Sequence, residues 1–281
     1  MSNQNALQKI LHFFLTKIII GIVVVAGSVA FTEWLGRLIL DRISINSEIK
    51  NFIVGIAEAG IALLSYILLF RAYEKRAITE LQLSTFGKHA LPGFLIGLLI
   101  QSLLILVIYV YGGYTIEKVN PGSSIIPVFS IAISAGFVAE IIIRGIIFRI
   151  TEEKTGTVIA LIILTIVFAL MHFNAKGATT VSIIATAIQA GFLLSAAYVY
   201  TRSLWFTIFF HFAWDLTEPG IYGAVNPGNT IENSILQSRI TGPQLITGGS
   251  LGPENSIQAI LFCLATALLF LWLAKRKKHF K

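Results

Sequence analysis

Residues 125–150 read IIPVFSIAISAGFVAEIIIRGIIFRI, an apolar stretch interrupted by the carboxylate of Glu140 and the guanidinium of Arg144. About 20 apolar residues are enough for a helix to cross the ~30 Å hydrocarbon core of a bilayer. A charged side chain at the centre of such a helix costs roughly 2.5 to 3.5 kcal/mol on insertion scales, so it rarely lacks a role. The stretch therefore predicts a membrane helix that carries part of an intramembrane site.

The composition of the whole chain is that of a membrane protein. Of its 281 residues, 56% are hydrophobic and only 12% are charged, whereas about a quarter of the residues in a soluble domain are charged. The net charge of +7 does not predict a nucleic-acid partner, because the Lys and Arg residues gather at the ends of apolar stretches. Cys263 is the only cysteine, which excludes a disulfide framework and a cysteine zinc site.

Apolar stretches divide the chain into candidate membrane spans. They cover residues 11–35, 52–70, 91–111, 125–150, 158–173, 181–200, 204–216 and 257–274. The seventh is short, so it needs flanking residues or a protein-lined setting. No connection is long enough to bury a core of its own. We expect an all-α polytopic membrane protein, with a single membrane domain over residues 1–281 and about eight transmembrane helices around an intramembrane polar cavity.

The positive charges of the connections predict the orientation. If the N-terminus is cytoplasmic, most Lys and Arg residues of the connections fall on the cytoplasmic side, including Arg71, Lys75, Arg76 and the tail 275–278. The positive-inside rule then places both termini in the cytoplasm. We expect an integral membrane protein, located in a bacterial inner membrane and surrounded by membrane lipid.

Residues 217–256 form the longest connection and differ from the spans in composition. Gly, Pro, Asn and Ser occur throughout, including Pro219, Pro227, Pro243 and Pro253. This composition is typical of an irregular loop, here on the non-cytoplasmic side. Two interpretations stay open, a mobile surface loop and a lid over a site.

Glu140 and Arg144 are four residues apart, so they share one face of a helix and can pair. A purely structural ion pair is one interpretation. The helix is expected to continue past Ile150 to a turn at Gly156, and Glu140 and His172 each lie about 16 residues from that turn, or ~24 Å along antiparallel helices. The sequence therefore predicts that this carboxylate and this imidazole lie at the same depth.

His211 and Asp215 are also four residues apart and share a face of the span 204–216. Imidazole and carboxylate groups transfer protons near neutral pH and bind metal ions. A lone histidine in an apolar stretch is more often a satisfied hydrogen-bonding group, but two histidines with two carboxylates favour a site. His172, His211 and Glu140 are therefore candidate zinc ligands, since two His and one Glu form a normal catalytic zinc set, and a metal-free Glu and His pair is the alternative.

The chain from residue 137 to 215 resembles a known family, the CAAX prenyl endopeptidase and bacteriocin-processing (CPBP, or Abi) intramembrane proteases. The first family motif has two adjacent glutamates, three further residues and an arginine, usually followed by glycine. Ala139, Glu140, Arg144 and Gly145 occupy these positions. The order and spacing of this motif, within an apolar stretch, place the family core at residues 125–216.

Two further motifs support the resemblance. A phenylalanine four residues before a histidine matches Phe168 and His172, and a histidine followed four residues on by a small polar residue matches His211 and Asp215. Residues 200–205 also look like the tight turn that precedes the last motif in the family. Each motif is weak alone, but their common order and membrane setting are fairly specific.

The resemblance implies an intramembrane endopeptidase that hydrolyses a peptide or protein near the membrane. In the family, the first glutamate and the histidine of the second motif, here His172, are thought to activate a water molecule. The groups at His211 and Asp215 would stabilise the oxyanion or hold a metal, and Arg144 would position Glu140.

Ala139 is the departure from the family pattern, because it stands where the first glutamate belongs. A methyl group can neither take a proton nor bind a metal, and the loss of a general base typically costs 10² to 10⁴ in rate. We therefore expect little or no activity. The alternatives are a catalytically inactive pseudoprotease or binding scaffold and, with less support because the sequence shows no internal repeat, a small ion-coupled transporter.

Overall fold

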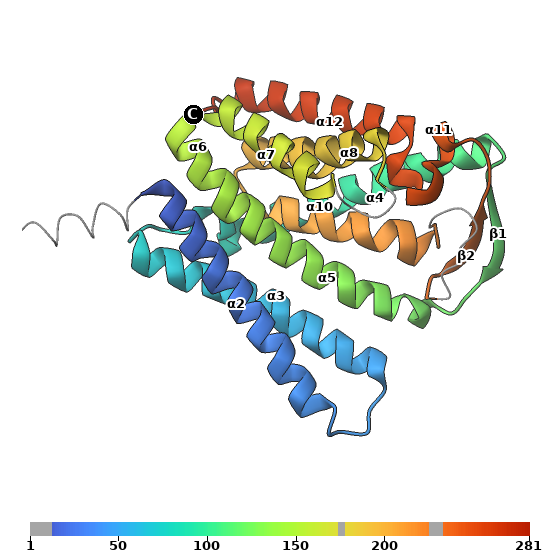
Figure 1. The fold of residues 1–281 in the computed structure, drawn as a ribbon, viewed down its shortest axis with the longest axis horizontal. Coiled ribbons are helices and arrows are strands. Elements are labelled where there is room, and N and C mark those ends of the chain that lie inside the picture. The colour runs from blue at the N-terminus through green and yellow to red at the C-terminus, as the bar shows by residue number, and fades with distance from the viewer. Residues whose placement is uncertain (1–12, 174–177, 225–232) are drawn as a thin grey trace, which may run out of the picture.

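The computed structural model describes residues 13–173, 178–224 and 233–281 (Figure 1). The start of the first predicted span, at residue 11, and Pro227 lie outside the described residues. The described chain is a bundle of helices with a small sheet at the end away from the C-terminus (Figure 1).

Six helices of the described chain are long and apolar enough to cross a membrane. They are α2 (Phe14–Leu40), α3 (Ser47–Tyr73), Leu83–Val110 with α4 (Phe86–Val110), the continuous helix Gly122–Thr155, the helix Thr180–Thr201 and α12 (Ile257–Arg276). Their length and composition indicate an integral membrane protein. Each of them corresponds in order and position to a predicted span, because long apolar runs specify membrane helices strongly.

The two other predicted spans correspond to shorter helices. α7 (Thr157–His172) has 16 residues and α10 (Leu204–Leu216) has 13, so they extend only ~24 and ~20 Å. α10 packs against α4, α5 and α9 (Leu194–Thr201), and it runs through the middle of the bundle in Figure 1. A helix enclosed by other helices has its ends covered by protein, which permits this short length.

The helix that carries Glu140 and Arg144 changes its winding along its length. α5 (Ile126–Glu140) is followed by a π-helical segment, Ile141–Phe148, and by α6 (Arg149–Thr155). Gly156 then turns the chain into α7 with a φ of 85°, in the left-handed region where glycine has no steric penalty. The prediction that this helix continues past Ile150 and turns at Gly156 is confirmed.

The helix Thr180–Thr201 has the same construction. α8 (Thr180–Thr186) leads into a second π-helical segment, Ala187–Leu193, and then into α9. Arg202 follows in the left-handed conformation, with a φ of 52°, and α10 begins two residues later. The predicted tight turn within residues 200–205 is therefore present.

The all-α architecture is confirmed, and a small two-stranded antiparallel sheet, which was not predicted, accompanies the helices. β1 (Tyr114–Val119) pairs with β2 (Leu236–Ile240), and the pairing brings Tyr114 opposite Ile240. The segment 217–256, predicted to be irregular, thus contains a strand as well as α11 (Gln244–Thr247). The prediction failed here because the two strands are more than a hundred residues apart, so no hairpin turn signals their pairing.

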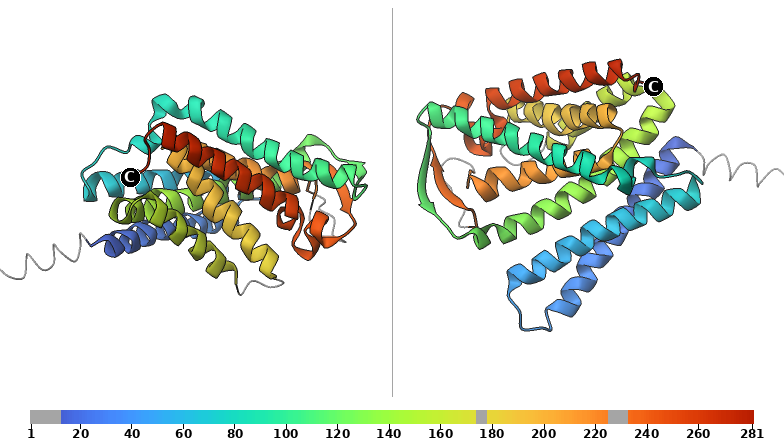
Figure 2. Two further views of the ribbon diagram at one scale, coloured as in Figure 1. Left: turned by 90° about the horizontal axis from the view of Figure 1, so that it is seen from above. Right: turned by 180° about the vertical axis from the view of Figure 1, so that it is seen from behind.

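α2 and α3 form a pair that lies along one side of the bundle (Figures 1 and 2). α3 contacts α5 directly, and Gly55 of α3 lies so close to Ser130 that a Cβ at Gly55 would be 2.6 Å from the Ser130 carbonyl oxygen. At the end near the C-terminus, Glu74 pairs with Lys17 at 3.2 Å and with Arg149 at 2.9 Å. These ion pairs join α2, the end of α3 and α6.

Close packing between α4 and α10 depends on glycine. At Gly97 of α4, a Cβ would lie 2.6 Å from the carbonyl oxygen of Phe210 and 3.1 Å from the Cβ of Ala213. Because real Cβ contacts are almost never this short, the missing side chain is what lets α4 approach the backbone of α10 and fix its position.

We predict that Gly97→Ala lowers the melting temperature of the detergent-solubilised protein, because the added methyl group must push α4 and α10 apart. Gly60→Ala is the matched control, since no atom lies within 4 Å of its Cβ position in the middle of α3. The control should be neutral or slightly stabilising, by up to about 1 kcal/mol, because alanine is the better helix former. Equal melting temperatures for the two variants would contradict the close approach of α4 and α10.

Candidate functional site

Glu140, Arg144 and His211 meet inside the bundle. Oε1 of Glu140 accepts a hydrogen bond from Nη1 of Arg144 at 2.7 Å, and Nδ1 of His211 lies 2.9 Å from the same oxygen. Both Glu140 and Arg144 are fully buried. The predicted pair on one helix face is therefore present, and a third polar side chain, that of His211 on α10, joins it.

Arg144 also ties two π-helical segments together. Its Nη2 donates to the backbone carbonyl of Ala190, and these residues belong to Ile141–Phe148 and Ala187–Leu193 respectively. Single π-helical turns inside α-helices occur frequently at functional sites, where they re-aim side chains. Gly191, in the second segment, lets this helix approach α7, because a Cβ there would lie 2.8 Å from the Cα of Thr165.

His211 bridges two carboxylates. Its Nε2 lies 3.4 Å from Oδ2 of Asp215, one turn further along α10, while its Nδ1 faces Glu140. A neutral imidazole has one N–H donor, whereas the imidazolium has two. The protonated ring is thus the form that can donate to Glu140 and Asp215 at the same time.

His172 ends α7 and has a different set of partners. Its Nδ1 lies 2.9 Å from the carbonyl oxygen of Phe168, and its ring stacks on the Phe168 ring with a centroid distance of 6.4 Å. A carbonyl only accepts, so Nδ1 carries the proton and Nε2 is the nitrogen that can take one. Arg144 lies over the same Phe168 ring, with its Cζ 5.4 Å from the centroid. The helix of Glu140 therefore meets α7 through the contact between Arg144 and Phe168.

His172 and His211 both line one cavity of about 350 Å³, which we call the histidine cavity. Its lining includes His172, His211 and Asp215. The other residues around it are Phe168, Thr186, Gln189, Ala190, Leu193, Leu194, Phe210, Trp214 and Glu254. Glu140 is not part of the lining, because it lies fully buried behind His211. Three of the four polar residues predicted to converge thus share this cavity, while their catalytic roles stay predictions.

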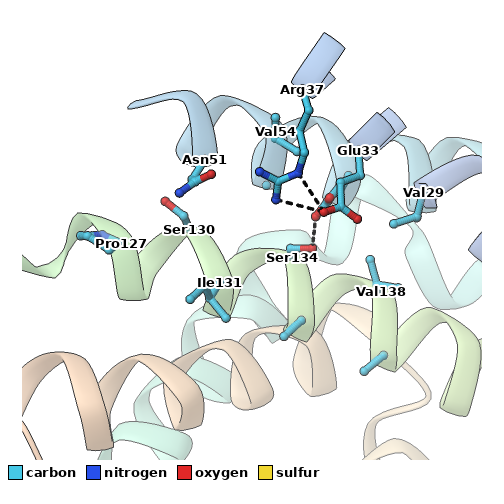
Figure 3. Close-up of a pocket in the computed structure, with 14 residues that line it drawn as sticks. Val29, Glu33, Arg37, Asn51, Val54, Pro127, Ser130, Ile131, Ser134 and Val138 are labelled. Atoms are coloured by element: carbon cyan, nitrogen blue, oxygen red, sulfur yellow. Dashed lines mark hydrogen bonds and ion pairs between the residues drawn. The ribbon is translucent and has the colours of Figure 1, made fainter. Parts of the chain in front are cut away.

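Ala139 lines a different and larger cavity, of about 670 Å³, between α2, α3 and α5. Figure 3 shows Ser134 and Val138 of α5 facing Glu33 and Arg37 of α2 across this cavity, and Ala139 belongs to the same face of the helix. Neither histidine lines it. The larger cavity therefore holds the replaced family position, but the smaller one holds both histidines and Asp215.

Successive residues of a helix point about 100° apart, which separates Ala139 from Glu140. Glu58 of α3 lies in the larger cavity and accepts a hydrogen bond from Ser134. Glu33 also lies there and pairs with Arg37 at 3.0 Å. Neither glutamate joins the histidine cavity.

The lining of the histidine cavity also includes Gln189, Trp214 and Glu254, which were not predicted from the sequence. Gln189 carried a usable signal, because a polar amide within an apolar span is unusual. Glu254 carried none, since it belongs to a short turn, Pro253–Asn255, at the end of the segment 217–256 and has no helical spacing to the other residues. Part of the loop predicted as a possible lid thus lines the cavity.

The predicted zinc ligands do not form a ligand group. Among the residues that the structure describes, no three His, Cys, Asp or Glu side chains are arranged to hold a metal ion. Glu140 gives one oxygen to both Arg144 and His211, and its burial keeps it away from the cavity that His172 lines. A zinc site at these residues therefore stays a prediction.

Residues 121–217 match a family model described as type II CAAX prenyl endopeptidase Rce1-like. This segment is an Rce1-like domain. It contains Glu140, Arg144, His172, His211 and Asp215, so the family resemblance predicted from the sequence is confirmed. The turn with Glu254 lies outside the matched segment. Nothing among the curated proteins or the solved structures matches the chain significantly.

The buried pair in the Rce1-like domain leads to a prediction about stability. Arg144→Met leaves the carboxylate of Glu140 buried with His211 as its remaining partner, and breaking a buried pair in this way typically costs about 3 to 5 kcal/mol. We expect a large drop in the melting temperature of the detergent-solubilised variant. The double variant Glu140→Gln with Arg144→Met should recover part of this loss, because no uncompensated carboxylate is left. A double variant less stable than Arg144→Met would contradict this account.

Proposed function

We propose that the protein is an intramembrane endopeptidase, which hydrolyses a peptide bond of a membrane-associated peptide or protein. The observation that carries this proposal is the cavity of the Rce1-like domain, in which His172, His211 and Asp215 come together among membrane helices. A cavity in this position favours a substrate that reaches the protein along the membrane. Hydrolysis needs a group that takes a proton from water and a group that stabilises an oxyanion, and both are available there.

In the proposed reaction His172 accepts a proton. Its Nδ1 donates to the Phe168 carbonyl, which fixes the ring and leaves Nε2 as the basic nitrogen. Nε2 takes a proton from a water molecule while the water oxygen attacks the carbonyl carbon of the substrate. The same proton then passes to the departing amine nitrogen as the C–N bond breaks.

His211 is proposed to stabilise the negative charge that develops on the carbonyl oxygen. Glu140 holds Nδ1 of His211 at 2.9 Å and Asp215 holds Nε2 at the longer distance of 3.4 Å. This long contact leaves the Nε2 donor available to an oxyanion. Arg144 in turn holds the Glu140 carboxylate in place through their ion pair. A donor that is oriented before the reaction costs no reorganisation during it.

A pseudoprotease that binds a membrane-associated peptide without cleaving it is the second candidate. Ala139 favours it, because the family position for a water-activating carboxylate carries only a methyl group. An ion-coupled transporter has less support, since nothing in the sequence indicates an internal repeat.

We also propose eight membrane crossings, which counts α7 and α10 with the six long helices, and a bacterial inner membrane as the location. Lys and Arg residues gather at the C-terminal ends of α3 and α12, at Arg71, Lys75 and Arg76 and in the tail 275–278. The positive-inside rule then makes this end of the bundle cytoplasmic.

This topology predicts that reporters fused to Met1 and to Lys281 both lie in the cytoplasm. A fluorescent reporter that matures only in the cytoplasm should be active at either end, and a periplasm-specific phosphatase reporter should be inactive at both. Termini on opposite sides of the membrane would show that α7 or α10 does not cross.

The proposed reaction predicts that the chain, purified and reconstituted in liposomes, cleaves a lipidated fluorogenic peptide with a CAAX-type end. His172→Ala should lower kcat at least ~10²-fold, because a general base contributes roughly 10² to 10⁴. His89→Ala is the control, since His89 belongs to α4 and does not line the histidine cavity.

Three other outcomes of the cleavage assay have different meanings. Cleavage that survives His172→Ala would contradict the proposed mechanism. Peptide binding without any cleavage would favour the pseudoprotease. A loss of cleavage on chelation, reversed by zinc, would restore the prediction of a zinc site made from the sequence, whereas the metal-free reaction should be indifferent to chelators.

A further inference from the structure

The backbone around Glu254 is held firmly at the edge of the histidine cavity. Nε2 of Gln189 donates to the carbonyl oxygen of Glu254 at 2.5 Å. The buried side chain of Asn255 donates to the Leu251 carbonyl at 3.0 Å, and Ser256 caps α12 by accepting from the amide of Ala259 at 3.3 Å. The turn is therefore fixed at both ends, to the helix of Gln189 and to α12, and Glu254 has a defined position.

The side chain of Glu254 lines the same cavity as the two histidines. Its Oε2 lies 3.4 Å from Nε1 of Trp214, which donates to it from α10. Burial raises the pKa of Glu254, and the neighbouring Asp215 raises it further, while Trp214, His172 and His211 act in the opposite direction. A carboxylate whose pKa is moved towards neutrality is a better general base than an exposed one.

The other carboxylates near the site pair with charged side chains or lie outside the histidine cavity. Glu218 is a buried neighbour of Glu254 but does not line this cavity. Glu140 is buried and shared between Arg144 and His211, and Asp215 pairs with His211. Ala139, at the family position for a carboxylate, lines the cavity between α2, α3 and α5 instead. The carboxylate in the histidine cavity with no charged side chain bonded to it, among the described residues, is Glu254.

We propose that Glu254 supplies the water-activating carboxylate of this chain and, together with His172, replaces the glutamate that is missing at position 139. This inference rests on the proposed endopeptidase function and adds a catalytic residue to it from outside the family segment. It also makes the end of the segment 217–256 part of the active site.

The proposed hydrolysis needs only water and the peptide substrate as reactants. A water molecule gives one proton to the Glu254 carboxylate, and its oxygen forms a bond to the substrate carbonyl carbon, with the electron pair of the C=O bond moving to the oxygen. The C–N bond then breaks, Glu254 returns the proton to the amine nitrogen, and the products are a carboxylic acid and an amine. Glu254 thus takes the proton in place of His172, and His172 Nε2 accepts a hydrogen bond from the second O–H of the same water and orients it.

The test compares single variants of the full-length protein in liposomes with the lipidated fluorogenic peptide. We expect Glu254→Gln to lower kcat at least ~10²-fold with little change in KM, because the amide keeps the shape of the carboxylate but cannot take a proton. Glu58→Gln is the matched control, since Glu58 is a partly buried glutamate of the other cavity, and it should keep full activity. Unchanged melting temperatures show that both variants are folded.

The variant Ala139→Glu tests whether the water-activating carboxylate belongs at position 139, as in the family, or is supplied by Glu254. A glutamate at position 139 should not raise the activity, because that position faces the other cavity. Full activity of Glu254→Gln, with activity abolished by His172→Ala, would overturn the role of Glu254 and leave the endopeptidase function standing. An inactive unaltered chain that gains activity with Ala139→Glu would also overturn it, in favour of position 139. If neither chain cleaves the peptide, both the proposed function and the role of Glu254 are wrong.

Discussion

The rest of the structure depends on the two hydrogen bonds that one oxygen atom of Glu140 makes, to Arg144 and to His211. A lone carboxylate in the interior of a membrane protein is costly, so Glu140 requires these partners. Arg144 is on the same helix as Glu140, but His211 is on α10, so the carboxylate joins α5 to α10. The glycines of α4 then let a third helix close on α10, and Arg144 reaches Ala190 in the helix that follows α7. Satisfying this one charge thus positions the helices that line the histidine cavity.

Features that depend on spacing within one helix were predictable from the sequence. The pair of Glu140 and Arg144, the pair of His211 and Asp215 and the turn at Gly156 all follow from a rise of 1.5 Å and a rotation of 100° per residue. The order of the membrane helices was predictable for the same reason, because apolar length alone specifies a span.

Features that depend on how one element is rotated against another were not predictable. The sequence shows that Ala139 adjoins Glu140, but not that it lines a different cavity, since this follows from the packing of α5 between α3 and α10. The π-helical segment after Glu140 changes the rotation again, and no residue pattern signals it. Glu254 and the pair of strands were not predicted because their neighbours in space are far away in the sequence. Turns and short strands are also too short to show a periodic pattern of apolar residues.

The central claim is that substrate occupies the smaller cavity, with His172 and His211, rather than the larger cavity that Ala139 lines. The most direct measurement is photo-crosslinking to the lipidated peptide from a benzophenone amino acid, placed either at Thr186 in the histidine cavity or at Asn51 in the larger one. This account predicts a crosslinked product from position 186 that unlabelled peptide competes away, and none from position 51. Crosslinking from position 51 alone would contradict it and would place the substrate beside Ala139.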